Sequence, residues 1–181
     1  QKSKIVSQTN YKGFYWNPQE NKIDIACFEG VEVILNLAGA SIAQRWSNAA
    51  KASILSSRTD ALALLHSSIE THNFPVKHII SASAIGVYPD SKTRYYDEKF
   101  QGADASFLRA VVKSWEGSLK PFQSIGVKTT ALRIGIVLNS QEGALPKIMG
   151  PIKHYFGAAL GSGDQWQSWI HIDDLVRLFM F

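Results

Sequence analysis

Three short apolar runs most constrain how this chain can fold. They are VEVILNLAG from Val31, KHIISASAIG from Lys77 and VKTTALRIGIVL from Val127. The first is rich in β-branched residues and almost continuously apolar after Glu32, which is typical of a strand buried on both faces of a parallel sheet. The second breaks into small residues at its end. We predict that all three are neighbouring strands.

Two helical stretches separate these predicted strands. After the first run, Ser47 is a predicted N-cap, and apolar residues recur at helical spacing from Ile54 to Ile69. This helix is expected to end near His72 and Asn73. A second helix is predicted at 103–122, where Pro121 should kink or end it. The order strand, helix, strand, helix, strand predicts a parallel α/β sheet with right-handed crossovers.

Composition excludes several classes of partner. The chain has 181 residues, of which 45% are hydrophobic and 19% charged, so it suits one globular domain. Its net charge of +4 is spread along the chain, without the basic cluster expected for a nucleic-acid or membrane partner. A single cysteine, Cys27, allows no intrachain disulfide and fits the cytoplasm. The uncapped ends suggest that the natural protein extends beyond both.

The ends of the predicted strands are the places to look for a ligand. In parallel α/β sheets, ligands bind outside the carboxyl ends of the strands. Here these ends are 36–39, 81–86 and 133–135, and all three are unusually small or polar. Such residues leave space and backbone donors for a bound molecule.

Six runs, in this order, resemble the extended short-chain dehydrogenase/reductase superfamily. They are NLAGASIAQRW, SRTDALALL, SASAIGVYP, FLRAVVKSWE, LRIGIVLN and AALGSGDQWQSWIHIDDL. The resemblance is closest to an atypical branch named as nucleoside-diphosphate-sugar epimerases, and it covers about Tyr11 to Leu178. It implies a Rossmann-type, doubly wound parallel sheet and a bound NADP or NAD. The family's first strand and Gly-rich phosphate turn are missing and are expected before Gln1.

The resemblance also divides the chain. Residues 1–138 would form an NAD(P)-binding domain, incomplete at its N-terminus. Residues 139–181 would begin a substrate-binding region and a returning helix, incomplete at the C-terminus. An acidic or basic residue after the second strand usually separates NAD users from NADP users. Lys2 and Lys4 lie near that place, and their positive charge is compatible with NADP.

By the same resemblance, residues at the strand ends contact the cofactor. Asn36, Leu37, Ala38 and Gly39 would lie against the adenosine side, and Arg58 would approach the phosphates. Arg133, Ile134 and Gly135 would pass the nicotinamide, and Ser81 and Ala82 are the remaining predicted cofactor contacts. Plainer interpretations remain: a strand-to-loop turn with Gly39 at positive φ, a solvated Arg58, and a structural ion pair for Arg133.

The predicted catalytic residue is Ser83, because superfamily members hold the substrate oxygen with a hydroxyl here. A hydroxyl both donates and accepts, as a moving proton requires. A backbone-capping serine is the alternative. The family's Tyr-x-x-x-Lys pair is absent, since its positions hold Leu108 and Val112. Tyr88 could still reach a substrate from its loop.

The stretch GSGDQWQSWIHIDDL contains the other candidate residues. Trp169 and His171 are predicted to line a substrate pocket, and Asp173 and Asp174 to cap the following helix, where its dipole favours negative charge. A zinc site would need more well-spaced ligands, so we predict no metal. A hydrolase would need a Gly-x-Ser-x-Gly elbow, which the sequence lacks.

Together these features predict an NAD(P)-binding, epimerase-like or reductase-like enzyme. Its expected substrate is a small molecule, with a nucleotide sugar or related secondary alcohol as the family's class. The alternative is a non-catalytic dinucleotide-binding module that acts as a sensor or regulator. A homodimer is a candidate assembly.

Overall fold

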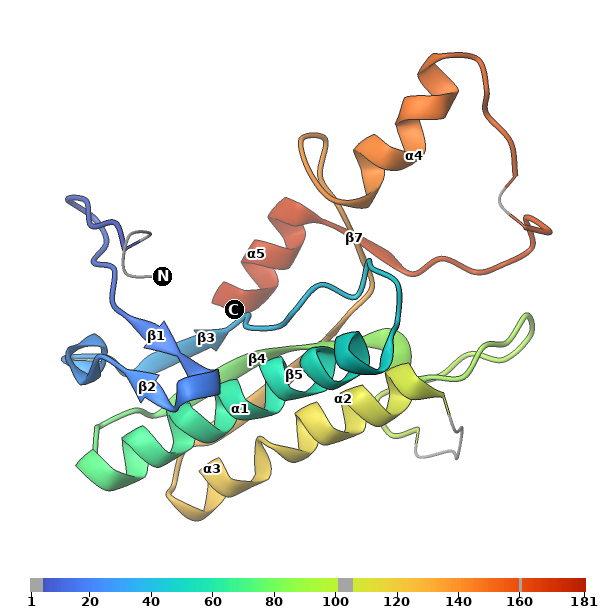
Figure 1. The fold of residues 1–181 in the computed structure, drawn as a ribbon. Coiled ribbons are helices and arrows are strands. Elements are labelled where there is room, and N and C mark those ends of the chain that lie inside the picture. The colour runs from blue at the N-terminus through green and yellow to red at the C-terminus, as the bar shows by residue number, and fades with distance from the viewer. Residues whose placement is uncertain (1–4, 101–105, 160) are drawn as a thin grey trace.

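The computed structural model describes residues 5–100, 106–159 and 161–181 (Figure 1). The strands are β1 (Trp16–Asn17), β2 (Lys22–Ile23), β3 (Val33–Asn36), β4 (His78–Ala84), β5 (Lys128–Ile134), β6 (Ile136–Leu138) and β7 (Trp169–His171). The α-helices are α1 (Asn48–His72), α2 (Phe107–Gly117), α3 (Lys120–Ser124), α4 (Ala144–Lys153) and α5 (Ile172–Met180).

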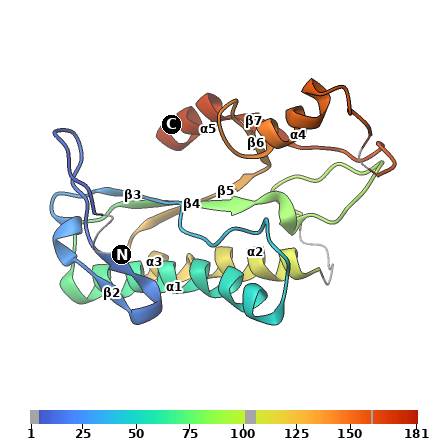
Figure 2. The same cartoon turned by 45° about the horizontal axis from the view of Figure 1, so that its top comes forward.

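The main sheet contains the three predicted strands in the order β3-β4-β5. Both pairings are parallel, and the register places Asn36 opposite Ser81 and Ser83 opposite Arg133. Helices α1, α2 and α3 lie along one face of this sheet, and α5 lies on the other (Figure 2). The chain therefore has the predicted Rossmann-type α/β fold, with crossover helices between parallel strands.

Helix α1 begins and ends where the sequence predicts. The Ser47 hydroxyl accepts a hydrogen bond from the Ala50 amide at 3.2 Å, which satisfies one of the free donors of the first turn. At the other end Asn73 adopts a left-handed conformation with φ of 51°, and its amide reaches back to the last-turn carbonyls.

The core lies between the sheet and helices α1 to α3. Its buried members are Phe28, Leu62, Leu65, Ile69, Val76, Ile79, Trp115, Leu119, Phe122 and Val127. Because this layer fills the space beneath the strands, the strand ends are held at fixed relative positions.

Two predicted elements differ in the structure. The stretch expected as one helix is two, because α2 ends at Gly117 and Pro121 occupies the first turn of α3, where its missing amide costs nothing. Residues 103–105 of that prediction lie outside the described residues. The third strand stops at Ile134, and β6 pairs instead with β7 in a separate two-stranded sheet.

Gly135 explains this break. A Cβ at this position would overlap the carbonyl oxygen of Ser168, and the Ile136 amide donates to that same oxygen at 2.8 Å. A glycine therefore lets the segment before β7 cross close to the end of β5. The predicted domain boundary at residue 138, where β6 ends, stays a prediction.

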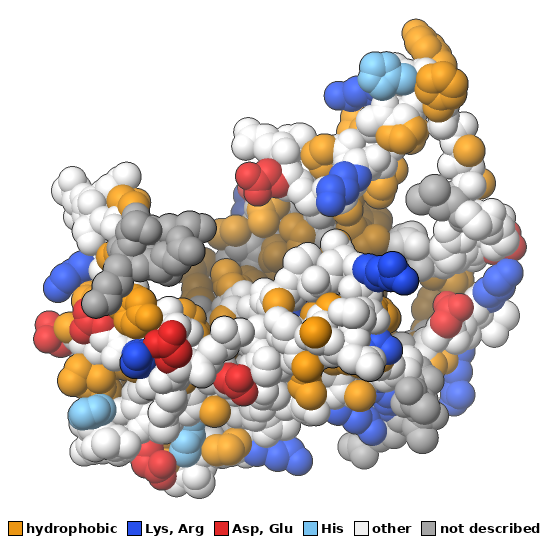
Figure 3. Space-filling view, viewed as in Figure 1, with side chains coloured by type: hydrophobic (Ala, Val, Ile, Leu, Met, Phe, Trp, Pro, Cys, Tyr) orange, Lys and Arg blue, Asp and Glu red, His pale blue; other side chains and the backbone are white. Residues whose placement is uncertain are grey.

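The space-filling view shows a hollow between the N-terminal segment and the C-terminal helices, with hydrophobic side chains along it (Figure 3). Within residues 5–100, 106–159 and 161–181, no helix combines the length and apolar character needed to cross a bilayer.

Candidate active site

The carboxyl ends of β3, β4 and β5 meet at one edge of the sheet, as the sequence predicts. This follows from their parallel order and register, in which Asn36, Ser81 and Ala131 are successive neighbours. The predicted cofactor and catalytic residues on these strands are thus brought together.

Asn36 and Ser81 join the first two strand ends. The Asn36 Nδ2 donates to Ser81 Oγ at 3.0 Å, its Oδ1 accepts from the Ala38 amide at 3.3 Å, and Ser81 Oγ donates to the Ala82 carbonyl at 2.9 Å. Both side chains are buried. Their polar atoms form hydrogen bonds within the protein, so the two side chains hold the strand ends together. The next residue, Leu37, is exposed.

Arg58 anchors the loop that follows β3. Its Nη1 donates to the carbonyls of Ala40 and Ile54 at 3.1 and 2.8 Å, and its guanidinium carbon lies 4.9 Å from the Trp115 ring centre. A Cβ on Gly39 would stand 3.0 Å from the same carbon. Burial lowers the pKa of Arg58. Its contacts hold the loop against α1, and a role at a cofactor phosphate stays a prediction.

A cavity of about 520 Å³ lies beside this loop. Its walls include Trp16, Asn17, Ala38, Gly39, Ser57 and Asp60. The small residues Ala38 and Gly39 therefore border open space at the end of β3. Lys2 and Lys4, the sequence hint for NADP, lie outside the described residues.

A chain of polar contacts links Ser83 to α2 and β5. The Ser83 Oγ donates to Glu116 Oε1 at 2.6 Å. Arg133 donates to the same carboxylate twice, from Nε to Oε1 at 2.8 Å and from Nη2 to Oε2 at 2.9 Å. Two parallel bonds from guanidinium to carboxylate give a rigid, strong pair. Only about a fifth of either charged side chain is exposed.

The charges of this pair are stabilised by each other. Burial raises the pKa of Glu116, but the hydrogen bonds from Arg133 and Ser83 outweigh burial, so the pKa falls below its usual value. The hydrogen bond to Glu116 raises the pKa of Arg133, against the effect of burial. The carboxylate and guanidinium are therefore both ionised at neutral pH.

Tyr88 extends the network toward the surface. It follows a short 3-10 turn, η4 (Ile85–Val87), and its Oη accepts a hydrogen bond from Arg133 Nη1 at 3.0 Å. The same Nη1 also donates to the Glu98 carbonyl at 3.2 Å. The Tyr88 ring stacks with the Tyr96 ring at 5.9 Å, which fixes its direction.

These groups line a cavity of about 580 Å³ at the end of β5. Its walls include Tyr88, Glu98, Glu116, Arg133, Ile134, Gly135, Ser168, Trp169 and Leu175. Predicted cofactor residues Arg133, Ile134 and Gly135 and predicted substrate residues Tyr88 and Trp169 thus share one cavity. The wall does not include Ser83, which is 4% exposed, or His171.

Leu108 and Val112 stand at the helix positions where the superfamily pattern has Tyr and Lys. A Cβ on Gly86 would lie 3.3 Å from the Leu108 Cβ and 3.8 Å from the Val112 Cγ2. Glu116 lies one further turn along the same face, at i+4 from Val112. Glu116 was not among the predicted site residues, although a charged residue that continues the face of Leu108 and Val112 was the available signal.

His171 has a different position from the one expected. It is the N-cap of α5, where its Nδ1 accepts from the Asp173 amide at 3.3 Å. Asp173 and Asp174 are therefore not the caps that we predicted. They lie in the first turn, where the helix dipole favours their charge.

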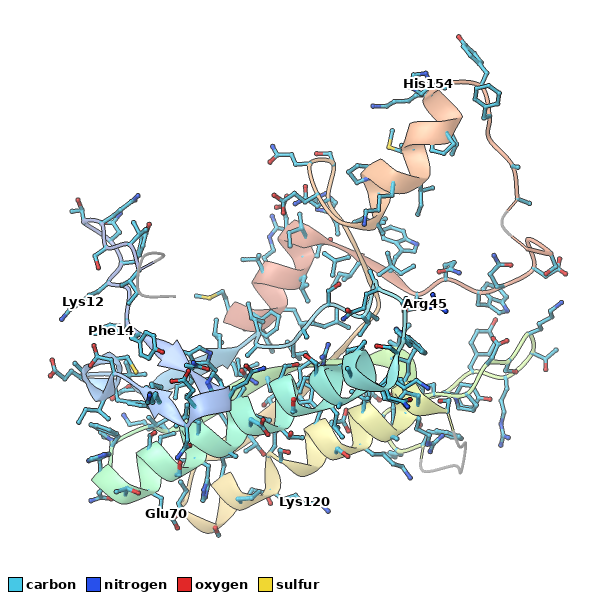
Figure 4. All side chains as sticks on the ribbon, viewed as in Figure 1. Lys12, Phe14, Arg45, Glu70, Lys120 and His154 are labelled. Carbon is cyan, nitrogen blue, oxygen red and sulfur yellow. The ribbon has the colours of Figure 1, made fainter. Side chains whose placement is uncertain are left out.

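A metal site does not emerge from these residues. His154 lies at the far end of α4 (Figure 4). In the described part of the chain, no three His, Cys, Asp or Glu side chains lie close enough to share an ion.

The curated relatives found by sequence comparison are epimerase family proteins. An epimerase family protein of Staphylococcus saprophyticus is 36% identical over 175 residues, which is 97% of this chain and 56% of the relative. The chain is a relative of the epimerase family proteins. It spans little more than half the length of the curated relatives it matches. No family model matches it.

Two solved structures of epimerase relatives share the fold. The human epimerase family protein, crystallised with NADPH, matches 82% of this chain and 51% of its own, with 29% identity and a TM-score of 0.73. The nucleoside-diphosphate sugar epimerase of Corynebacterium glutamicum matches 97% of this chain and 36% of its own, with 26% identity and a TM-score of 0.78. The resemblance found in the sequence is thereby confirmed.

Proposed function

We propose that this protein binds NAD or NADP and acts as an epimerase-like or reductase-like enzyme on a secondary alcohol of a nucleotide sugar. The observation that carries the proposal is the linked set Ser83, Glu116, Arg133 and Tyr88 beside a cavity at the carboxyl end of the sheet. Proton-transfer groups and a ligand-sized space coincide where this fold binds its ligands.

The residues present fit a dinucleotide. Cavities of about 520 and 580 Å³ lie at the ends of β3 and β5, and both have the size of ordinary ligand sites. Leu37, Ala38 and Gly39 would hold the adenosine side, and Ile134 and Gly135 the nicotinamide side. When bound, the cofactor supplies hydride transfer, while the protein orients the reacting groups. The NADPH of the human relative supports this choice.

The second candidate is a dinucleotide-binding module without catalysis. One observation favours it: Leu108 and Val112, which cannot carry a proton, stand at the positions of the superfamily's Tyr and Lys. In that case NADPH would bind and no sugar nucleotide would react.

The two candidates differ in turnover. NADPH binding is measured by fluorescence titration, and turnover is measured across a panel of nucleoside-diphosphate sugars for the wild type and Ser83→Ala. For the enzyme, we expect turnover that falls at least tenfold in Ser83→Ala while NADPH affinity stays within about twofold. Binding without turnover across the panel would favour the module, and absence of binding would refute both.

The remaining expectations on partners stay predictions. These are a homodimer, a cytoplasmic location, and no nucleic-acid or membrane partner.

A further inference from the structure

We propose that Tyr88, held by Arg133, is the group that exchanges a proton with the substrate oxygen in this protein. Ser83 and Glu116 would then position Arg133 and would not meet the substrate. The inference rests on the proposed function and deepens it, because it names the acid that the missing Tyr-x-x-x-Lys pair would otherwise supply.

The first reason is that helix α2 has no proton donor to offer at the expected place. Leu108 and Val112 pack toward Gly86, and Val112 is only 3% exposed. Lys113 is exposed and lies one residue off this face, which turns it about 100° around the helix. A proton for the substrate must therefore come from another element of the site.

The second reason is the direction of the hydrogen bonds. An arginine only donates, so the bond from Arg133 Nη1 uses a lone pair of Tyr88 Oη and leaves the phenol hydrogen free. None of the described residues accepts that hydrogen. The Ser83 hydrogen, in contrast, is committed to the Glu116 carboxylate at 2.6 Å. Of the two hydroxyls, only Tyr88 can donate outward.

The third reason is access. Tyr88 borders the cavity of about 580 Å³, together with Gly135 and Trp169. Ser83 is 4% exposed and is absent from that wall. A substrate oxygen in this cavity can approach the phenol without any rearrangement of the sheet.

The fourth reason is the fixed positive charge beside the phenol. Arg133 is held by two bonds to Glu116 and one to the Glu98 carbonyl, so it cannot swing away. A preorganised cation stabilises negative charge that develops on the phenol oxygen as its proton leaves. Lysine serves this purpose in the superfamily's standard pair, and here an arginine from a neighbouring strand would do so.

The proposed step balances in the direction of reduction. A bound NAD(P)H would supply the hydride for the new C–H bond at the carbonyl carbon, and the carbonyl π electrons would move to oxygen. The Tyr88 O–H bond breaks, and its proton forms the alcohol O–H. The phenolate left beside Arg133 takes a proton from water. Oxidation of the alcohol by NAD(P)⁺ is the reverse.

The kinetic test is Tyr88→Phe in the protein carrying NADPH, with the nucleoside-diphosphate sugar panel as substrates. Phenylalanine keeps the stacking ring and removes only the hydroxyl. We expect kcat to fall about 100-fold or more, the usual contribution of a general acid, with NADPH affinity within about twofold. Tyr95→Phe is the matched control, because Tyr95 is 86% exposed, and it should leave kcat unchanged. A Tyr88→Phe variant with kcat within threefold of wild type would overturn the proposal.

A second test does not depend on turnover. Neutron diffraction of the deuterated protein locates the hydrogens of Tyr88 and Ser83 directly. We expect the Tyr88 hydrogen to point into the cavity and the Ser83 hydrogen to point at Glu116. The opposite assignment, with the Tyr88 hydrogen donated to a protein acceptor, would refute the role of Tyr88 even if NADPH binds. Failure of the wild type to bind NADPH would refute the proposed function and this role together, whereas NADPH binding with the opposite hydrogen positions would refute this role alone.

Discussion

Replacing Glu116 with glutamine should destabilise the protein through one well-defined set of contacts. The carboxylate accepts three hydrogen bonds, at 2.6 Å from Ser83 and at 2.8 and 2.9 Å from Arg133. Glutamine has the same shape, but its amide nitrogen must face one of these donors. Arg133 would then keep its charge without a paired anion.

The expected cost is about 2–4 kcal/mol at pH 7. Removing one partner of a fully buried pair costs about 3–5 kcal/mol, and single bonds to a charged group contribute about 1.5–3 kcal/mol. The side chains of Arg133 and Glu116 are 21% and 22% exposed, so water moderates the loss. The measurement is urea-induced unfolding followed by circular dichroism.

The difference in unfolding free energy between the wild type and Glu116→Gln should also depend on pH. The folded-state pKa of Glu116 lies below its unfolded value, mainly because the bonds from Arg133 and Ser83 overcome burial. The ionised Glu116 carboxylate therefore contributes its full stability above the ordinary carboxyl pKa of about 4.3. This contribution is lost as the pH falls through the folded-state pKa. At about pH 3 the unfolding free energies of the two proteins should therefore differ less than at pH 7.

Glu32→Gln is the control for this experiment. The Glu32 carboxylate lies 2.6 Å from Lys77 Nζ, but these side chains are 61% and 69% exposed. Its loss should cost less than about 1 kcal/mol. A Glu116→Gln variant that matches this control, or whose deficit is the same at both pH values, would refute the reasoning.

Three further predictions concern the fold. Phe122→Ala should cost about 3–5 kcal/mol in chemical unfolding, because Phe122 is fully buried in the core; a loss below 1 kcal/mol would contradict that placement. Ser47→Ala should cost about 1 kcal/mol by removing the α1 cap, and an unchanged unfolding midpoint would argue against the cap. Gly135→Ala should speed amide hydrogen exchange at Ile136, since the added methyl displaces Ser168. Gly117→Ala, which has open space, is its control and should leave exchange at Ile136 unchanged.

The three-strand sheet could be predicted because its signal is local. Continuous apolar runs with helical stretches between them are compatible with few arrangements besides a parallel sheet with crossover helices. The ends of α1 were predictable for the same reason, since Ser47 and Asn73 act on their own helix.

The polar network could not be predicted, because its members depend on distant partners. Ser83 meets a carboxylate 33 residues away, and Arg133 meets the same group from another strand. The break at Gly135 likewise depends on Ser168 and leaves no periodic trace in an apolar run. His171 as a helix cap was missed because histidine is not among the preferred capping residues.

The outer edge of β3 is open to one further strand. In the described sheet β3 pairs with β4 alone, so the backbone groups along its other side meet no strand within that sheet. An unpaired strand edge is a template for adding another strand. The family's first strand, expected before Gln1, would extend the sheet by joining such an edge through backbone hydrogen bonds.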